Sequence, residues 1–326
     1  MNSESKNKTL IVCNDAGGGE ILAAHVSRLI SYVCRLSNFY FVITGPARKI
    51  FRDRGLITDH AGDNPISPSD VFDKISLIDD VITATSWATS LEIDFIREAK
   101  SRKIHTTTYL DHWYNYRERF GYPNEAWTAN LPDEIRTGDQ YAYETAKAAF
   151  PMVKVVLEPN PFFGDIKLRY KEAKNRETLL YGTTVLYASQ PLSGPVSYFV
   201  KRTESSLDEF EILQRVLSSF LASGRKESFV IRPHPSENGM KFESILNKFK
   251  DKINVSISKN SDMFTDLAEA KIVVGVGSMF LVTASMCGIP TVSFIPDNCK
   301  IGDLPIGNIV KVNNDDDLTS YFKNYE

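Results

Sequence analysis

Short apolar runs alternate with amphipathic segments along almost the whole chain. In the first half, the runs that predict strands cover residues 9–13, 39–44, 81–84, 104–110, 134–137 and 153–157. Segments with apolar residues at helical spacing predict helices after residue 19, through residue 54, and over residues 90–101 and 140–150. Because strands that alternate with helices form parallel sheets with helices on both faces, this half predicts a doubly wound α/β domain.

The second half of the chain repeats this alternation. Its predicted strands cover residues 178–181, 184–188, 228–231, 253–256, 271–275, 291–294 and 308–312. A helix with a capping box of Ser206 and Glu209 is expected next to them, and further helices over residues 241–249, 263–269 and 280–287. The pattern therefore predicts a second doubly wound parallel sheet.

The boundary between the two halves is predicted near residue 160. Residues 158–164 are rich in turn formers and residues 167–176 are highly charged, as is typical of a linker. We expect an N-terminal Rossmann-like domain over residues 1–160 and a C-terminal one over residues 161–326. In such a pair the carboxyl ends of both sheets face a cleft, and ligands bind just outside those strand ends.

Composition excludes several classes of protein. The 326 residues carry 38 Lys and Arg against 41 Asp and Glu, and 42% are hydrophobic, which argues against a disordered chain and against a dedicated nucleic-acid binder. No run of about 18 apolar residues exists and the first eight residues are polar, so a soluble, cytoplasmic protein is expected. The basic stretch over residues 48–54 leaves contact with the inner face of a membrane open, although a solvated helix face is its commoner meaning.

The cysteines and histidines show no metal-binding pattern. The four cysteines form no Cys-x-x-Cys pair, and the five histidines lack the spacing of metal ligands. We expect buried free thiols, no structural metal and no cofactor beyond a substrate.

A glycine-rich segment follows the first predicted strand directly. Gly17, Gly18 and Gly19 would let backbone N–H groups approach an anion at a helix N-terminus. The spacing matches neither a dinucleotide-binding fingerprint nor a Walker loop. Asp15 and Glu20 flank the glycines, and either carboxylate could act as a general base toward a hydroxyl. A plain strand-to-helix turn is the alternative.

Two further segments also follow predicted strands. His234 stands between Pro233 and Pro235, which stiffen its loop, and Arg232 adds a positive charge, so this loop suits a phosphate. Later, the Gly277-Ser278 pair leads into a helix whose N–H groups could hold the distal phosphate of a nucleotide. A structural histidine and a plain turn remain the alternatives.

Aromatic and ionisable residues are concentrated after the strand that ends near residue 110. Trp113 and two nearby tyrosines could form a platform for a sugar, with Asp111 and His112 as polar anchors. Ser86, which follows another strand of the same half, could line the same cleft. A plug at a domain interface is the alternative.

On these motifs the chain resembles GT-B-type glycosyltransferases, and the second half looks like their donor-binding domain. His234-Pro235 resembles the His-Pro motif of bacterial sialyltransferases, Kdo transferases and glycerophosphotransferases, in which the histidine contacts the phosphate of a CMP- or CDP-activated donor. Ser278 matches the first residue of their Ser-Ser/Thr motif, although Met279 replaces the second hydroxyl. Residues 266–275 and 284–292 are similar to the non-hydrolysing UDP-GlcNAc 2-epimerases.

The resemblance implies a metal-independent glycosyltransferase with a nucleotide-sugar donor and a surface glycan or lipid-linked glycan of capsule or lipopolysaccharide as acceptor. The residues expected to bind nucleotide or phosphate are Gly17, Gly18, Gly19, Arg232, His234, Pro235, Gly277, Ser278 and Met279. Asp15, or else Glu20, would take the acceptor proton, and His234 would stabilise the leaving phosphate.

Two other functions stay open on the sequence. The first is a nucleotide-sugar 2-epimerase or hydrolase, for which Asp111, His112 and Glu118 could supply the additional acid-base groups. The second is a non-catalytic protein that binds a nucleotide sugar and supports another transferase, since one fold hosts many functions.

Overall fold

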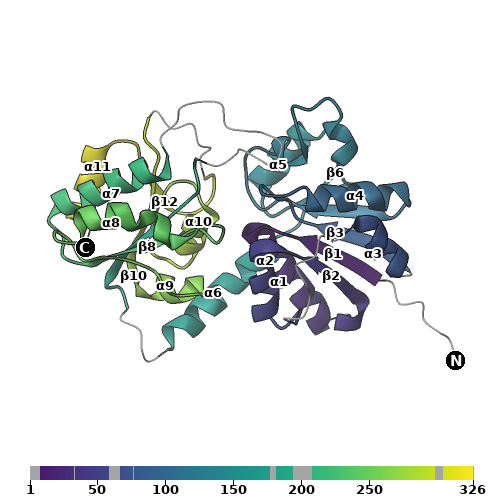
Figure 1. Cartoon of the computed structure of the whole chain (residues 1–326), viewed down its shortest axis with the longest axis horizontal. Coiled ribbons are helices and arrows are strands. Elements are labelled where there is room, and N and C mark those ends of the chain that lie inside the picture. The colour runs from purple at the N-terminus through teal and green to yellow at the C-terminus, as the bar shows by residue number, and fades with distance from the viewer. Residues whose placement is uncertain are drawn as a thin grey trace. The chain divides into compact units, whose positions relative to one another are not determined.

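The structure is a computed structural model that describes residues 8–32, 34–58, 67–75, 77–176, 181–193, 208–297 and 304–325. The described residues form two compact units, the first ending at Phe163 and the second beginning at Gly164. Each unit contains one six-stranded sheet with parallel neighbours throughout. Helices flank both sheets (Figure 1), which confirms the predicted pair of doubly wound α/β units.

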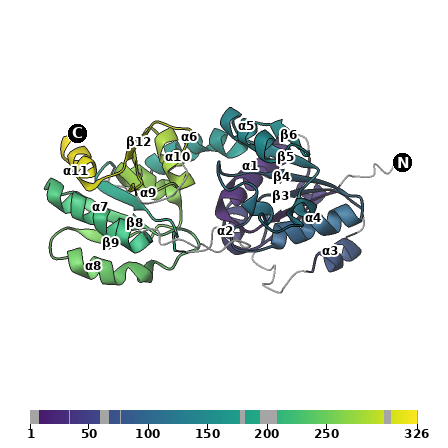
Figure 2. The ribbon, with the colours of Figure 1, turned by 90° about the horizontal axis from the view of Figure 1, so that it is seen from above.

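The first sheet has the strand order β2-β1-β3-β4-β5-β6. Its strands are β1 (Lys8–Cys13), β2 (Phe39–Ile43), β3 (Ile78–Thr83), β4 (His105–Tyr109), β5 (Glu134–Thr137) and β6 (Lys154–Leu157). Its helices are α1 (Ala16–Tyr32), α2 (Gly45–Asp53), α3 (Pro68–Lys74), α4 (Leu91–Ser101) and α5 (Gln140–Ala149). Helices α1 and α2 lie on one face of the sheet, and α3 and α4 pack on the other through a core of Leu10, Val12, Phe72 and Phe95 (Figure 2).

Helix α6 (Pro161–Lys174) replaces the linker expected after residue 160. The Asn-Pro pair that suggested a turn is instead a helix start, because the Asn160 side chain accepts the Phe162 N–H at 3.0 Å and Pro161 begins the helix. Phe162 and Ile166 are buried. The charged residues that follow belong to a helix, so the prediction of a linker was wrong.

The second sheet has the strand order β12-β11-β10-β7-β8-β9. Its strands are β7 (Thr184–Ala188), β8 (Ser228–Arg232), β9 (Val255–Ile257), β10 (Ala270–Gly275), β11 (Thr291–Phe294) and β12 (Ile309–Val312). Its helices are α7 (Glu209–Ser223), α8 (Glu243–Phe249), α9 (Met263–Glu269), α10 (Met279–Met286) and α11 (Asp315–Asn324). The predicted strand over residues 178–181 lies largely outside the described residues.

The start of α7 differs from the prediction. Its capping box consists of Asp208 and Glu211, two residues later than expected, and the predicted partner Ser206 lies outside the described residues. The Asp208 carboxylate accepts the Glu211 N–H at 2.8 Å, while the Glu211 side chain accepts the Asp208 N–H at 3.2 Å. A capping box is present as expected, but at a different pair of residues. The acidic residues Glu209 and Glu211 lie two positions apart, so the sequence allows a capping box at either position.

Each sheet has one point where the direction of strand addition reverses. In the first sheet the reversal lies between β1 and β3, and in the second it lies between β7 and β10. The loops that leave the carboxyl ends of such neighbouring strands lead to opposite faces and leave room for a ligand between them. We call these two positions the first and the second switch point.

Candidate functional site

The loops at the first switch point meet through Asp15. Its Oδ1 accepts the Ser86 hydroxyl at 3.0 Å and the Asn14 side-chain amide at 2.9 Å, and its Oδ2 accepts the Trp87 N–H at 2.7 Å. Asp15 and Asn14 follow β1, whereas Ser86 and Trp87 follow β3. The structure therefore brings the predicted base Asp15 and the predicted substrate residue Ser86 into direct contact, with the carboxylate held in one orientation.

The three glycines form the first turn of α1, and close packing accounts for each of them. A Cβ at Gly17 would lie 2.2 Å from the Asp111 carboxylate, and one at Gly18 would lie 2.2 Å from the Ala84 Cβ. A Cβ at Gly19 would lie 3.0 Å from Ala47. A carboxylate of the protein thus lies against this turn. A role for the glycines in phosphate binding stays a prediction.

Asp111 forms a buried ion pair that the sequence analysis did not anticipate. Arg119, which is 2% exposed, donates from Nη1 to Asp111 Oδ1 at 2.6 Å and to the Thr85 hydroxyl at 2.5 Å. The Trp87 ring covers the guanidinium at 4.2 Å. Asp111 was predicted to anchor a sugar. One of its carboxylate oxygens therefore already accepts a hydrogen bond from Arg119.

Glu92 is a second buried acid that the sequence analysis missed. It is 2% exposed, and its Oε1 accepts the backbone N–H of Asn14 at 2.7 Å. Burial raises the pKa of Glu92 to about 8, and the neighbouring charges of Asp15 and Asp111 add to the effect. Near neutral pH this switch point therefore combines a protonated carboxyl group with a nearby carboxylate. The signal was present in the sequence, because Glu92 falls on the apolar face of α4 with Phe95 and other buried residues.

Glu20, the alternative base, has a different partner. Its Oε2 lies 3.2 Å from Nη2 of Arg54 at the C-terminal end of α2, and the carboxylate is largely buried. The structure places Glu20 in an ion pair with Arg54. Its role as a base stays a prediction.

The predicted sugar platform lies partly in the core. Trp113 is 5% exposed and its indole N–H donates to Asp139, the N-cap of α5, at 2.7 Å. The Nδ1 atom of His112 accepts the Trp113 N–H at 2.9 Å. Trp113, Tyr114 and Tyr116 line a surface groove of about 300 Å³ beside α5. Binding of a sugar there stays a prediction.

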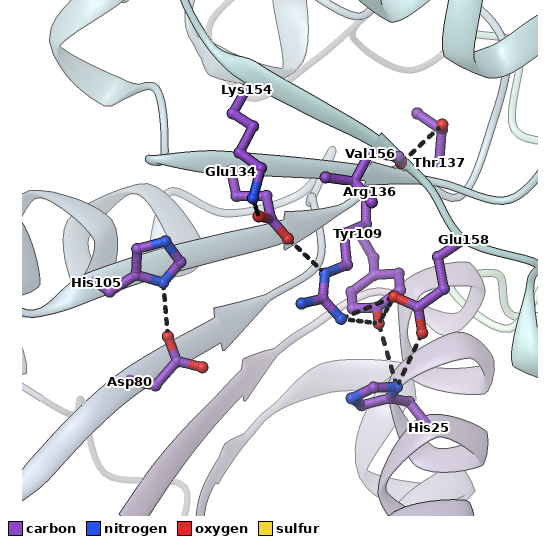
Figure 3. Close-up of polar contacts among 10 residues, drawn as sticks. All are labelled: His25, Asp80, His105, Tyr109, Glu134, Arg136, Thr137, Lys154, Val156 and Glu158. Atoms are coloured by element: carbon purple, nitrogen blue, oxygen red, sulfur yellow. Dashed lines mark hydrogen bonds and ion pairs between the residues drawn. The ribbon is translucent and has the colours of Figure 1, made fainter.

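A polar network joins α1 to the carboxyl ends of neighbouring strands in the first sheet (Figure 3). The hydroxyl of Tyr109, the last residue of β4, donates to Glu158 at 3.0 Å and accepts from Arg136 at 3.0 Å. Its remaining contact is with Nδ1 of His25 at 3.1 Å, so a neutral His25 ring carries its proton on Nδ1. Burial lowers the pKa of His25 and raises that of Tyr109. The network ties α1 to the carboxyl ends of β4, β5 and β6.

The loops at the second switch point also meet through a hydrogen bond. The Gly277 N–H after β10 donates to the Gln190 side chain after β7 at 3.0 Å. The next residue, Ser278, is the N-cap of α10, and its Oγ accepts the Phe280 N–H at 3.2 Å. Its hydroxyl proton can then be donated to a ligand. Met279 follows as the first residue of α10.

His234 lies in the loop that follows β8, the strand on the other side of β7. Its Nδ1 accepts the backbone N–H of Ser236 at 3.2 Å and lies 2.7 Å from the Ser236 hydroxyl. A neutral ring must therefore carry its proton on Nε2, where it can donate to a phosphate oxygen. The structure thus brings the predicted residues His234 and Ser278 to strands on either side of β7, and leaves Pro235 exposed beside them.

Arg232, the predicted phosphate ligand, is paired within the protein. Its Nη1 donates to the buried carboxylate of Asp266 and to the Asn260 carbonyl at 3.2 Å. The guanidinium also lies 5.7 Å from the centre of the Phe280 ring. Its charge is balanced by Asp266, so His234 and the start of α10 are the better-placed groups for a phosphate.

Lys241 and two glutamates form a charged group in this unit that the sequence pattern does not indicate. The Lys241 ammonium contacts Glu209 and Glu237, which lie 32 and 4 residues away. Burial opposes ionisation of Glu209, but hydrogen bonds from Lys241 and Ser193 bring its pKa down to about 2. No local sequence pattern predicts this ion pair, because Glu209 and Lys241 belong to separate elements.

The described residues offer neither a metal site nor a membrane span. Within these ranges, no group of three or more His, Cys, Asp and Glu residues is arranged to hold a metal ion. The helices described above are all too short or too polar to span a bilayer.

Comparison with known proteins identifies similar folds. No protein-family model matches the sequence, and no curated protein matches it significantly. The UDP-GlcNAc 2-epimerase of Methanocaldococcus jannaschii, solved with UDP-GlcNAc and UDP, is similar with a TM-score of 0.69 at 12% identity, over 98% of this chain and 93% of that one. The Neisseria meningitidis UDP-GlcNAc 2-epimerase bound to UDP-GlcNAc gives 0.68 at 15% identity, over 97% and 90%.

A polymerising enzyme shares the architecture as well. The wall teichoic acid polymerase TagF is similar with a TM-score of 0.59 at 11% identity, over 100% of this chain and 82% of that one. At these identities the likeness shows the fold alone. It confirms the expected GT-B-like pair of Rossmann-like units, and it leaves the activity to the site residues.

Proposed function

We propose that this protein is a glycosyltransferase that takes a sugar from a nucleotide donor bound by its second unit. The observation that carries the proposal is the pair of hydrogen-bond donors beside β7: the Nε2–H of His234 and the hydroxyl of Ser278 at the start of α10. A dinucleotide or nucleotide diphosphate binds at such a switch point in other doubly wound sheets. Similar folds whose structures contain UDP or UDP-GlcNAc support a nucleotide sugar as the ligand.

The proposed reaction is a substitution at the anomeric carbon. The acceptor oxygen forms a bond to that carbon, the bond from the carbon to the donor phosphate oxygen breaks, and the acceptor proton passes to Asp15. Among the described residues, Asp15 Oδ2 accepts one hydrogen bond and so has capacity for a further one. His234 and the N-terminus of α10 would stabilise the negative charge that develops on the leaving phosphate.

The finer features of the reaction are proposals from the His-Pro resemblance. They are a cytidine-activated donor, a surface glycan or lipid-linked glycan as acceptor, and catalysis without a divalent metal. Turnover that persists in chelator would support the last of these. Loss of turnover in chelator and its return with Mg²⁺ or Mn²⁺ would contradict it.

The first test is a binding and turnover screen. Thermal shifts with CMP, CDP, UDP and GDP identify the nucleotide, because a ligand at about a hundredfold excess over its Kd stabilises by about 2.7 kcal/mol. The matching nucleotide sugars are then incubated with glycan acceptors. Release of nucleotide that depends on acceptor is expected. Nucleotide binding without turnover under any condition would favour a binding protein and refute the transferase.

A nucleotide-sugar 2-epimerase or hydrolase is the second candidate. The gathering of Asp15, Glu92 and Asp111 at one switch point favours it, because epimerisation needs both an acid and a base, and Glu92 is protonated near neutral pH. Two of the similar folds belong to 2-epimerases. Incubation in D₂O without acceptor separates the candidates. Deuterium at the epimerised carbon, or steady release of free sugar, would favour this reaction over transfer.

A further inference from the structure

A line of charged side chains connects the loop after β7, where Gln190 accepts the Gly277 N–H, to the loop after β8 that carries His234. Lys241 lies in the 3₁₀ helix Gly239–Phe242, and its ammonium donates to Glu209 at 2.8 Å and to Glu237. The side chains of Glu209 and Glu237 are only 4% and 3% exposed. Two buried carboxylates thus share one ammonium as their common partner.

Each carboxylate in turn holds one of the loops that follow the neighbouring strands β7 and β8. Glu209 accepts the backbone N–H groups of Leu192 and Ser193, after β7, at 3.1 and 2.8 Å. Glu237 accepts the backbone N–H of His234, after β8, at 2.9 Å. The ammonium therefore adds a side-chain connection between the loop after β7 and the histidine loop, beyond the backbone hydrogen bond that Ser189 N–H donates to the Arg232 carbonyl at 2.9 Å.

Two aromatic rings and two carboxylates surround the Lys241 ammonium and favour its charged form. The rings of Phe210 and Phe242 lie 5.2 and 4.9 Å from the ammonium. Burial opposes its charge, but the hydrogen bonds that the ammonium donates to Glu209 and Glu237 raise the pKa of Lys241 above its ordinary value. Without the ammonium, two buried like charges would face each other, and the loops would separate to let water reach them.

We propose that Lys241 is a positioning residue for the donor site. It fixes the loop after β7 and the histidine loop relative to each other, and through Glu237 it sets the direction in which His234 presents Nε2–H. The proposal rests on the proposed function for the identity of the ligand, whereas the arrangement of the imidazole can be tested without one.

The test compares Lys241→Met and Lys241→Arg with the wild-type protein. Nuclear magnetic resonance of ¹⁵N-labelled histidine reports the tautomer of His234, assigned with a His234→Gln variant. We expect one Nε2–H tautomer in the wild type and in Lys241→Arg, and a mixture in Lys241→Met. Lys248→Met is the matched control, because Lys248 is exposed on α8 and donates a long hydrogen bond of 3.4 Å to Gln214.

Calorimetric titration with UDP and with CMP gives the second readout. For the nucleotide that binds the wild type, Lys241→Met should lower affinity about tenfold, the low end of the loss that follows when a partner that orients a metal ligand is removed. Lys241→Arg should stay within about threefold, because it keeps the charge. If Lys241→Met does not fold, Glu237→Gln replaces it: this variant keeps an acceptor for the His234 N–H and should show a smaller loss.

The outcomes separate the two claims. An unchanged tautomer and unchanged affinity in folded Lys241→Met, or equal losses in Lys248→Met, would overturn the positioning role. If neither UDP nor CMP binds the wild type, the titration is repeated with CDP and GDP; if none of the four binds, the proposed function fails, and the tautomer comparison alone decides the role of Lys241.

Discussion

Replacing Glu92 by Gln is expected to stabilise the protein at neutral pH. The side chain is buried beside Asp15 and Asp111, and its pKa is raised from 4.5 to about 8. Glutamine has nearly the same shape and keeps an oxygen to accept the Asn14 N–H. Glutamine never ionises. Ionisation in water therefore no longer stabilises the unfolded chain relative to the folded protein at neutral pH.

The size of the effect follows from proton linkage. A carboxyl group with a raised pKa stabilises the folded state fully below the pKa of the unfolded chain, and that contribution is lost as pH rises toward the pKa of the folded state. At roughly 1.4 kcal/mol per pH unit, keeping Glu92 protonated at pH 7 costs about 3 kcal/mol. At pH 5 the same cost is below about 1 kcal/mol.

Urea unfolding of both proteins at pH 5 and pH 7 measures this difference. Glu92→Gln should gain about 3 kcal/mol in the free energy of unfolding at pH 7 and less than about 1 kcal/mol at pH 5. Glu98→Gln is the control, because this side chain of α4 is partly exposed and pairs with Arg102 at the surface, and it should change stability by less than about 0.5 kcal/mol at both values. Equal stability of Glu92→Gln and wild type at both pH values would show that Glu92 ionises freely and would refute the reasoning.

Two further pairs of substitutions test a buried ion pair and the packing of the glycine turn. Arg232→Met should cost about 3 kcal/mol of unfolding free energy, because it leaves the Asp266 carboxylate buried without its cation, and adding Asp266→Asn should recover part of the loss; no recovery would contradict the pairing. Gly18→Ala should cost about 1–3 kcal/mol, because its Cβ would lie 2.2 Å from that of Ala84. Gly164→Ala, in an open part of α6, should instead gain up to about 1 kcal/mol, and equal effects at the two glycines would refute the packing argument.

Much of the fold could be predicted because it depends on local pattern. The apolar runs of the strands and the turns that follow them identify the carboxyl ends of β1, β8 and β10, and so place Asp15, His234 and Ser278 on the loops where ligands of such sheets bind. Helix α6 was not predicted for two reasons. Its start, an N-cap followed by proline, has the same sequence as a turn, and its many charged residues resemble a linker.

The partners of the site residues could not be predicted in the same way. The ion pairs of Arg119 with Asp111 and of Lys241 with Glu209 join residues from separate elements, so no spacing reveals them. Glu92 is the exception, since a charged residue on the apolar face of a predicted helix indicates a buried group from the sequence pattern itself.

A crystal structure of the protein with UDP or CMP bound would test the central claim most directly. The account predicts a phosphate oxygen at about 3 Å from His234 Nε2 or from the Ser278 hydroxyl, outside the ends of β8 and β10. A nucleotide whose phosphates lie away from both side chains would contradict it.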